Sequence, residues 1–128
     1  MSLLLDTHVL IWALTSPRSL SALARRLLEE PANQIVVSSV SIIEVFNKHR
    51  LGKLPDGDVI VGGLDAYLAQ LAATPLAVSH AHARLAGTIA HEHRNPFDRI
   101  LAAQAILEGT SMLTKDPFFA QVGVTVRW

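Results

Sequence analysis

Residues 3–14, LLLDTHVLIWAL, place a run of three leucines directly before an acid and a nearly continuous apolar segment. The run 3–5 has the length and composition of a buried strand, and Asp6-Thr7 is typical of a helix start. We expect the following helix to reach residue 14 and to end at Ser16-Pro17. A buried strand that leads directly into a helix is the beginning of a parallel α/β unit.

The rest of the chain repeats this alternation of short apolar runs and longer helical segments. Further strands are expected at residues 35–38, 76–79, 111–114 and 122–128, with residues 54–63 as a loop. Helices are expected at residues 20–30, capped by Ser19, and at 41–51, 64–73, 80–92 and 95–109, with a short one after Asp116-Pro117. The pattern predicts a single three-layer α/β/α domain, residues 1–128, around a central parallel sheet of about five strands.

Composition excludes several classes of protein. Lys plus Arg equals Asp plus Glu at 11 each, which argues against a tight nonspecific binder of nucleic acid. The chain has no cysteine, so a disulfide framework and a thiolate metal site are both excluded. No uncharged stretch reaches the ~20 residues that a membrane span needs, and we expect a cytoplasmic protein without a signal peptide.

Four acids stand where an expected strand or loop leads into a helix: Asp6, Glu44, Asp98 and Asp116. Each has a simpler explanation as a helix cap, and Ser41-x-x-Glu44 has the spacing of a capping box. However, helix starts that follow parallel strands meet in one crevice at the carboxyl edge of a sheet. Four acids in one crevice require a cation, and oxygen ligands favour Mg²⁺ or Mn²⁺.

This arrangement predicts metal-assisted hydrolysis of a phosphodiester, with the four carboxylates as metal ligands. Thr7 and Thr114 stand beside Asp6 and Asp116, where a hydroxyl would orient a carboxylate or a metal-bound water. Thr114 is equally well explained as a β-branched strand residue.

Four segments of the chain resemble the PIN-domain family, in particular VapC-type toxins: LLLDTHVLIWAL, VSSVSIIEV, HRNPFDRILAAQA and LTKDPFF. The resemblance implies that Asp6, Glu44, Asp98 and Asp116 form the metal site, supported by Thr7 and Thr114. It further implies Mg²⁺- or Mn²⁺-dependent cleavage of RNA such as tRNA or rRNA, homodimerisation, and inhibition by a cognate antitoxin. One departure is Asn95, where many relatives carry Asp, which lowers the negative charge beside the site.

Basic residues near the acids are candidates for contacts with RNA phosphates: Lys48, Arg94, Arg99 and Lys115. The alternative for each is a solvated surface charge. Trp12 and Phe46 are expected in the core or in a partner groove, and the His-x-His pairs at 80–82 and 91–93 are not expected to bind zinc.

Two other functions remain open at this point. A catalytically silent binding module would keep the same fold without turnover. A receiver-like signalling domain also places acids and Mg²⁺ at a sheet edge, but it needs an acid after the third strand, where this chain has Ser79-His80.

Overall fold

A computed structural model of the chain describes residues 1–91 and 95–128. Within these residues one five-stranded sheet, parallel throughout, has the order β3-β2-β1-β4-β5. The strands are β1 (Ser2–Leu5), β2 (Gln34–Ser38), β3 (Thr74–Leu76), β4 (Ser111–Leu113) and β5 (Val126–Arg127). The predicted parallel sheet is therefore confirmed.

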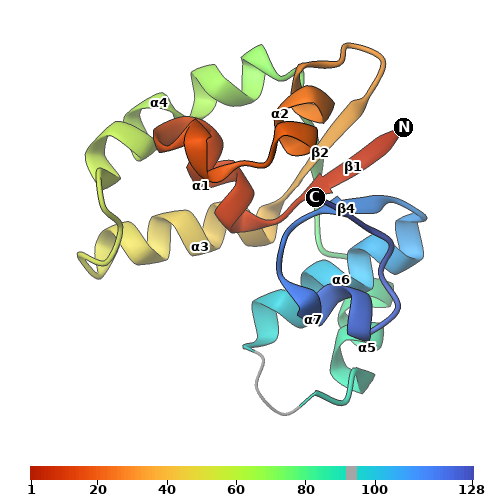
Figure 1. The fold of residues 1–128 in the computed structure, drawn as a ribbon. Coiled ribbons are helices and arrows are strands. Elements are labelled where there is room, and N and C mark those ends of the chain that lie inside the picture. The colour runs from red at the N-terminus through yellow and green to blue at the C-terminus, as the bar shows by residue number, and fades with distance from the viewer. Residues whose placement is uncertain (92–94) are drawn as a thin grey trace.

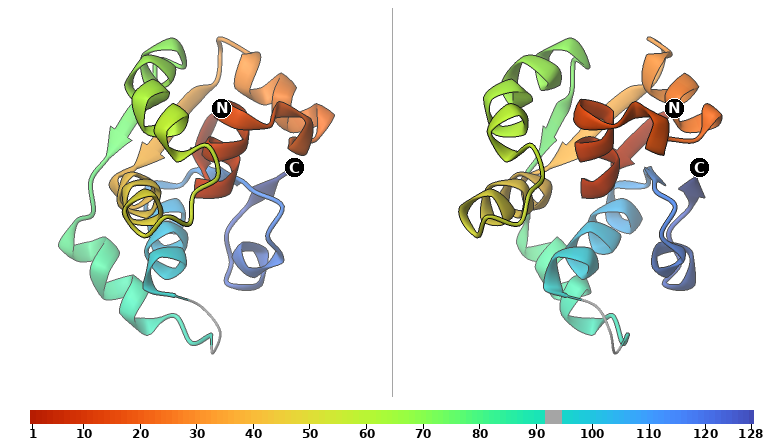
Figure 2. Two further views of the ribbon diagram at one scale, coloured as in Figure 1. Left: turned by 90° about the vertical axis from the view of Figure 1, so that its left-hand side faces the viewer. Right: turned by 60° about the vertical axis from the view of Figure 1, so that its left-hand side comes forward.

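Helices cover both faces of the sheet, which gives the expected three layers (Figure 1). They are α1 (Thr7–Thr15), α2 (Ala22–Glu29), α3 (Ser39–Arg50), α4 (Gly57–Gln70), α5 (His80–Thr88), α6 (Pro96–Glu108) and α7 (Pro117–Gln121), with a 3₁₀ turn at Pro17–Ser19. Helices α1, α2 and α4 lie on one side of the sheet, and α5, α6 and α7 lie on the other (Figures 1 and 2). None of the described helices is long and apolar enough to cross a membrane.

The strands bury both of their faces, which explains why they read as continuous apolar runs. Leu3 and Leu5 pack into the core beneath α1, α2 and α4, while Leu4 points to the opposite core beneath α6 and α7. Ile35 and Val37 alternate with Val36 in the same way. This alternation fixes the register of each strand, because a shift by one residue would exchange its two faces.

Several predicted boundaries are wrong. The helix expected at residues 20–30 begins at Ala22, and its cap is Ser21, whose hydroxyl accepts from the amide of Ala24 at 2.9 Å, rather than Ser19. Ser19 instead closes the preceding 3₁₀ turn, where its hydroxyl bonds to that of Ser16. The two serines have the same sequence-level preference for a cap, so only the turn between them separates their roles.

The expected loop at residues 54–63 is also wrong, because α4 already begins at Gly57. Ile60 and Leu64, one turn apart, are fully buried against the core of α1 and β1. Their burial outweighs the low helix propensity of Gly62 and Gly63, which costs about 1 kcal/mol per glycine. The strand expected at residues 76–79 is also wrong, because β3 lies at Thr74–Leu76 and shares only Leu76 with that range. Strand β5 is shorter than the expected 122–128, and helix α5 ends at Thr88. The last residue of the helix expected at 80–92 lies outside the described part of the chain.

The strand order places the functional edge of the sheet. Strands β2 and β3 lie on one side of β1, and β4 and β5 lie on the other, so the direction in which strands are added reverses at β1. In an open parallel sheet, such a switch point leaves a crevice at the carboxyl ends of the strands. Helix α3 contacts α1, α4 and α6, and it thus borders this crevice where the two helical layers meet.

Candidate active site

Asp6 occupies the centre of the crevice, directly after β1. Its side chain is only 8% exposed. Oδ1 accepts from the amide of His8 at 3.3 Å and so caps α1, and Oδ2 accepts from the hydroxyl of Thr114 at 2.7 Å. The capping explanation and the functional explanation for Asp6 are therefore compatible, because different oxygens of one carboxylate serve the cap and the crevice.

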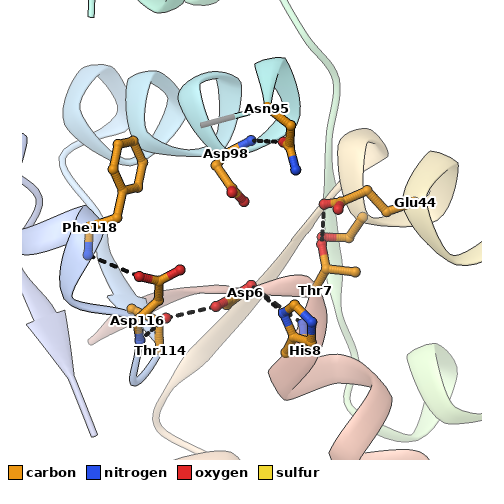
Figure 3. A network of polar contacts seen from close by, with 10 residues as sticks. Asp6, Thr7, His8, Glu44, Asn95, Asp98, Thr114, Asp116 and Phe118 are labelled. Atoms are coloured by element: carbon orange, nitrogen blue, oxygen red, sulfur yellow. Dashed lines mark hydrogen bonds and ion pairs between the residues drawn. The ribbon is translucent and has the colours of Figure 1, made fainter. Parts of the chain in front are cut away.

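Thr114 connects Asp6 to Asp116 at the end of β4. Its buried hydroxyl donates to Asp6 and accepts from the amide of Asp116 at 3.0 Å. Asp116 in turn caps α7 through Oδ1, which accepts from the amide of Phe118 at 3.0 Å. Both acids are thus fixed by short bonds to elements of the sheet edge (Figure 3).

Glu44 reaches the crevice from a different position than expected. Helix α3 begins at Ser39 and is capped by Ser38, so Ser41 is not a cap and Glu44 lies in the second turn. The hydroxyl of Thr7 donates to Oε1 of Glu44 at 2.7 Å, and it lies 2.8 Å from the hydroxyl of Ser41. Because the single proton of Thr7 points to the carboxylate, Ser41 is the donor to Thr7.

Ser41 was predicted from the sequence as a helix cap, but it belongs to this site. It is fully buried and belongs to a chain of hydroxyls from Ser41 through Thr7 to Glu44. Ser41 and Glu44 are three residues apart, so both project from the same face of α3. That spacing is also the spacing of a capping box, which is why the sequence alone left the two roles indistinguishable.

Asp98 lies in the first turn of α6. The predicted cap of this helix is confirmed, because Oδ1 of Asn95 accepts from the amide of Asp98 at 3.0 Å. The bond uses the backbone of Asp98, and its carboxylate faces the space that Asp6, Glu44 and Asp116 also face (Figure 3).

The electrostatics of Glu44 show that the acids affect each other. Burial raises the pKa of the Glu44 carboxyl above its usual range, and the nearby carboxylates of Asp98 and Asp6 raise it further. The hydrogen bond from Thr7 and the ammonium of Lys48 oppose this effect and lower the pKa. A half-buried anion among other anions is a position that a bound cation would stabilise.

The side chains do not yet form a closed coordination sphere. Among residues 1–91 and 95–128, no three His, Asp or Glu side chains are placed so that they could hold one metal ion together. The donor set nevertheless fits a hard cation, since all four acids offer oxygen atoms and face one space.

Three of the basic candidates can be placed. Lys48 is half-buried next to Glu44, and Lys115 is exposed with its ammonium 4.9 Å from the centre of the Trp12 ring. Arg99 is half-buried and donates to the backbone carbonyl of His91 at 2.5 Å, so it links α6 to the segment that follows α5. Arg94 and His93 lie outside the described residues.

The remaining aromatic and imidazole residues divide between core and rim. Trp12 packs partly against the core, as expected, whereas Phe46 is 45% exposed. His82 is buried, and its ring accepts from the amide of Ser79 in a capping box, which assigns it a structural role. The side chain of His8 is 58% exposed at the rim of the crevice.

Comparison with known proteins agrees with this fold. The family model described as "PIN domain" matches residues 3–124. The chain belongs to the PIN domain family. Among curated proteins, none matches the chain by sequence.

Solved structures share the whole PIN fold at low identity. A chain of the DNA-bound VapBC2 structure from Rickettsia felis superposes with a TM-score of 0.74 at 17% identity, covering 99% of this chain and 98% of that one. A toxin–antitoxin complex from Klebsiella pneumoniae gives 0.67 at 18%, covering 98% and 95%. FitAcB from Neisseria gonorrhoeae gives 0.67 at 22%, covering 97% and 95%. At these identities the likeness establishes the fold.

The PIN fold also removes the receiver-like alternative. Receiver domains have the strand order 2-1-3-4-5, whereas this sheet has the order 3-2-1-4-5. The third strand ends at Leu76 and is followed by no acid before α5. The crevice acids thus belong to a PIN domain and to a different arrangement of strands.

Proposed function

We propose that this PIN domain is a metal-dependent endoribonuclease toxin of a toxin–antitoxin pair. One observation carries the proposal: four carboxylates from separate segments face one space, and two buried threonines hold Asp6 and Glu44 toward it (Figure 3). A protein that needed only helix caps would not bury hydroxyl donors against two of these acids, because Ser, Thr or Asn caps serve equally well.

In this proposal Asp6, Glu44, Asp98 and Asp116 hold one or two Mg²⁺ or Mn²⁺ ions. When bound, such an ion lowers the pKa of its water and neutralises charge on the leaving oxygen. The residues of the chain have a separate task. Thr114 donates to Asp6 and Thr7 donates to Glu44, and both bonds favour the ionised carboxylate in a fixed orientation.

Lys48 and Lys115 are the basic residues that we propose to contact the phosphates of the RNA. Lys48 is close enough to Glu44 to affect its ionisation, and Lys115 directly precedes Asp116. A strand that approaches four carboxylates is repelled unless cations lie at the rim, and two ammonium groups there would offset that repulsion. Arg99 has a smaller part, because His91 already engages its guanidinium.

The proposal also includes the partners. We infer that residues 1–128 act as one domain, that it forms a homodimer, and that a cognate antitoxin neutralises it. The PIN family membership, the VapBC2 structure and the Klebsiella pneumoniae toxin–antitoxin complex among the similar structures support this inference. Exposed apolar side chains on α3, Ile43 at 51% and Phe46 at 45%, offer a surface for such contacts. Sedimentation of wild type beside Phe46→Glu tests the dimer, and a variant that sediments like wild type excludes Phe46 from the interface.

Cleavage of total bacterial RNA by the purified protein, free of antitoxin, tests the activity. We expect discrete fragments with Mg²⁺ or Mn²⁺, none with EDTA, and none from Asp6→Asn. Asn keeps the oxygen that caps α1, so this variant removes the charge without removing the cap. If folded wild-type protein gives no fragments in any condition, a catalytically silent binding module becomes the better explanation.

A further inference from the structure

A second recess, of about 500 Å³, lies next to the acids between α1 and the segment that joins α3 to α4. Helix α1 contributes His8, Ile11 and Trp12 to one wall. The opposite wall contains Lys48, Lys53 and Pro55. A recess of this volume is in the range of small-molecule sites, and its lining combines rings with two ammonium groups.

The recess adjoins the acidic crevice, because residues of its lining contact or neighbour two of the acids. His8 lines the recess, while its amide donates to Oδ1 of Asp6 and its Nδ1 lies 3.9 Å from the same oxygen. Lys48 lines both this recess and a smaller one, of about 190 Å³, that contains Glu44. A ligand in the larger recess would therefore lie beside the carboxylates on one side and beside Lys48 on the other.

The end of α3 fixes the two lysines next to each other. Gly52 has a φ of +70°, and its amide donates to the carbonyl of His49 at 3.0 Å. The amide of Lys53 donates to the carbonyl of Lys48 at 2.9 Å, which completes a Schellman motif. The chain thus turns back at Gly52, and Lys53 returns to the level of Lys48 instead of continuing along the helix.

A contact between α3 and α4 supports the wall that contains Lys48, Lys53 and Pro55. Nε2 of His49 lies 2.8 Å from Oδ1 of Asp58, and a Cβ at Gly57 would lie 2.7 Å from the His49 ring. Residues 52–56, of which only Leu54 is partly buried, therefore connect two helix ends that contact each other directly. A wall formed in advance loses little conformational entropy when a ligand binds.

From this geometry we infer that the recess holds one unpaired nucleotide of the RNA beside the phosphate to be cut, with the base against His8 and Trp12 and a phosphate against Lys48 and Lys53. The inference rests on the proposed function. Single-stranded nucleic acid is bound by flat side chains for the bases and by cations for the backbone. His8 and Trp12 have ring centres 5.8 Å apart at 42°, so they form an angled apolar corner rather than a single flat surface.

The charges of the lining favour a nucleotide over an acidic peptide side chain. The lining of the recess contains two cations, Lys48 and Lys53, and one acid, Asp56, which lies on the exposed segment before α4. The carboxylate of an acidic peptide could pair with the lysines, but the peptide would also need a separate apolar side chain of matching shape to fill the corner between His8 and Trp12. Occupation by an antitoxin arm is therefore a distinct outcome of the test.

Cross-linking of metal-free protein tests the inference without requiring turnover. The probe is a hexanucleotide of 4-thiouridine, irradiated with the full-length protein in EDTA and digested with trypsin. We expect cross-links on the peptide of residues 1–18, which contains His8 and Trp12. Cross-links confined to peptides of α5 or α6, or cross-links that appear on residues 1–18 only with a bound antitoxin peptide, overturn it.

Equilibrium binding of hexauridylate in EDTA gives a second readout. His8→Ala removes an exposed ring and is expected to weaken binding about tenfold, since base contacts with such rings amount to about 1–3 kcal/mol. Lys53→Ala should lower the slope of log K against log salt by about 0.7, the value for one phosphate contact on a single strand. Arg84→Ala, an exposed cation on α5, is the matched control and should leave the slope unchanged.

The cleavage assay separates the two hypotheses. If His8→Ala and Lys53→Ala bind hexauridylate and cleave RNA like wild type, the nucleotide subsite is refuted while the nuclease stands. If wild type shows no metal-dependent cleavage, yet cross-links on residues 1–18 and the effects of both substitutions persist, the recess binds nucleotides in a protein that does not cut them. That result overturns the proposed function and leaves the subsite intact.

Discussion

The hydroxyl chain Ser41–Thr7–Glu44 makes a quantitative prediction about two substitutions. Thr7→Val keeps the shape of the side chain of a residue that is 1% exposed but removes its hydroxyl. The lost bond to Glu44 is charge-assisted, at about 1.5–3 kcal/mol, and the buried hydroxyl of Ser41 loses its acceptor, at about 1–3 kcal/mol. Since such values are rarely additive, we expect a total destabilisation of about 2–4 kcal/mol.

Ser41→Ala should cost less. It removes the donor to Thr7, while Thr7 keeps its own donation to Glu44. The expected loss is about 1 kcal/mol, the net value of a neutral hydrogen bond. In the double variant the hydroxyl of Ser41 is absent, so removal of the Thr7 hydroxyl no longer leaves a buried donor without an acceptor. The double variant should therefore be more stable than the sum of the two single effects predicts, by about 1–2 kcal/mol.

Urea unfolding at pH 7 without divalent metal measures this cycle, with equal m-values as evidence that only stability changes. Ser39→Ala and Thr88→Val are matched controls, because both hydroxyls are exposed and donate to a backbone carbonyl. Each should change stability by no more than about 0.5 kcal/mol. Additivity of Thr7→Val and Ser41→Ala within about 0.3 kcal/mol would refute the hydroxyl chain.

Three further predictions concern the acids and the caps. Asp98→Asn should keep the fold, because the bond to the Asn95 cap uses the backbone amide of residue 98, but it should abolish cleavage and the increase in melting temperature caused by Mn²⁺. Asp65→Asn, which changes an exposed acid on α4, is the control. Cleavage by Asp98→Asn at the wild-type rate would exclude Asp98 as a ligand. In metal-free buffer the wild type should lose stability as pH rises from about 4.5 through the raised pKa of Glu44, because the folded state binds more protons than the unfolded state in that window. Glu44→Gln should flatten this part of the curve of urea midpoint against pH, and parallel curves for the two proteins would contradict the assignment. Ser21→Ala should cost about 1 kcal/mol as the cap of α2, whereas Ser19→Ala should cost much less, and equal losses by thermal melting would restore the cap predicted at Ser19.

The sequence by itself determined the type of each layer and the helix starts at which three of the candidate acids stand. Short apolar runs alternating with helical segments can only be buried as a parallel sheet between two layers of helices. The position of Asp6 after β1, of Asp98 after the Asn95 cap and of Asp116 before Pro117 followed from local signals, because a helix start is specified by a few adjacent residues.

Only the tertiary structure decided the order of the strands and the roles of residues with two possible functions. Burial of Ile60 and Leu64 in the core, where α4 packs against α1 and α3, turned the expected loop into the start of α4, and no local pattern contains this packing. Ser41 has the spacing of a cap, yet the position of Thr7, 34 residues earlier, makes it the donor of a buried hydroxyl chain. Lys48 and Lys53 belong to one recess because Gly52 reverses the chain and α1 packs opposite. Local preferences specify where elements begin, whereas long-range packing decides which side chains meet.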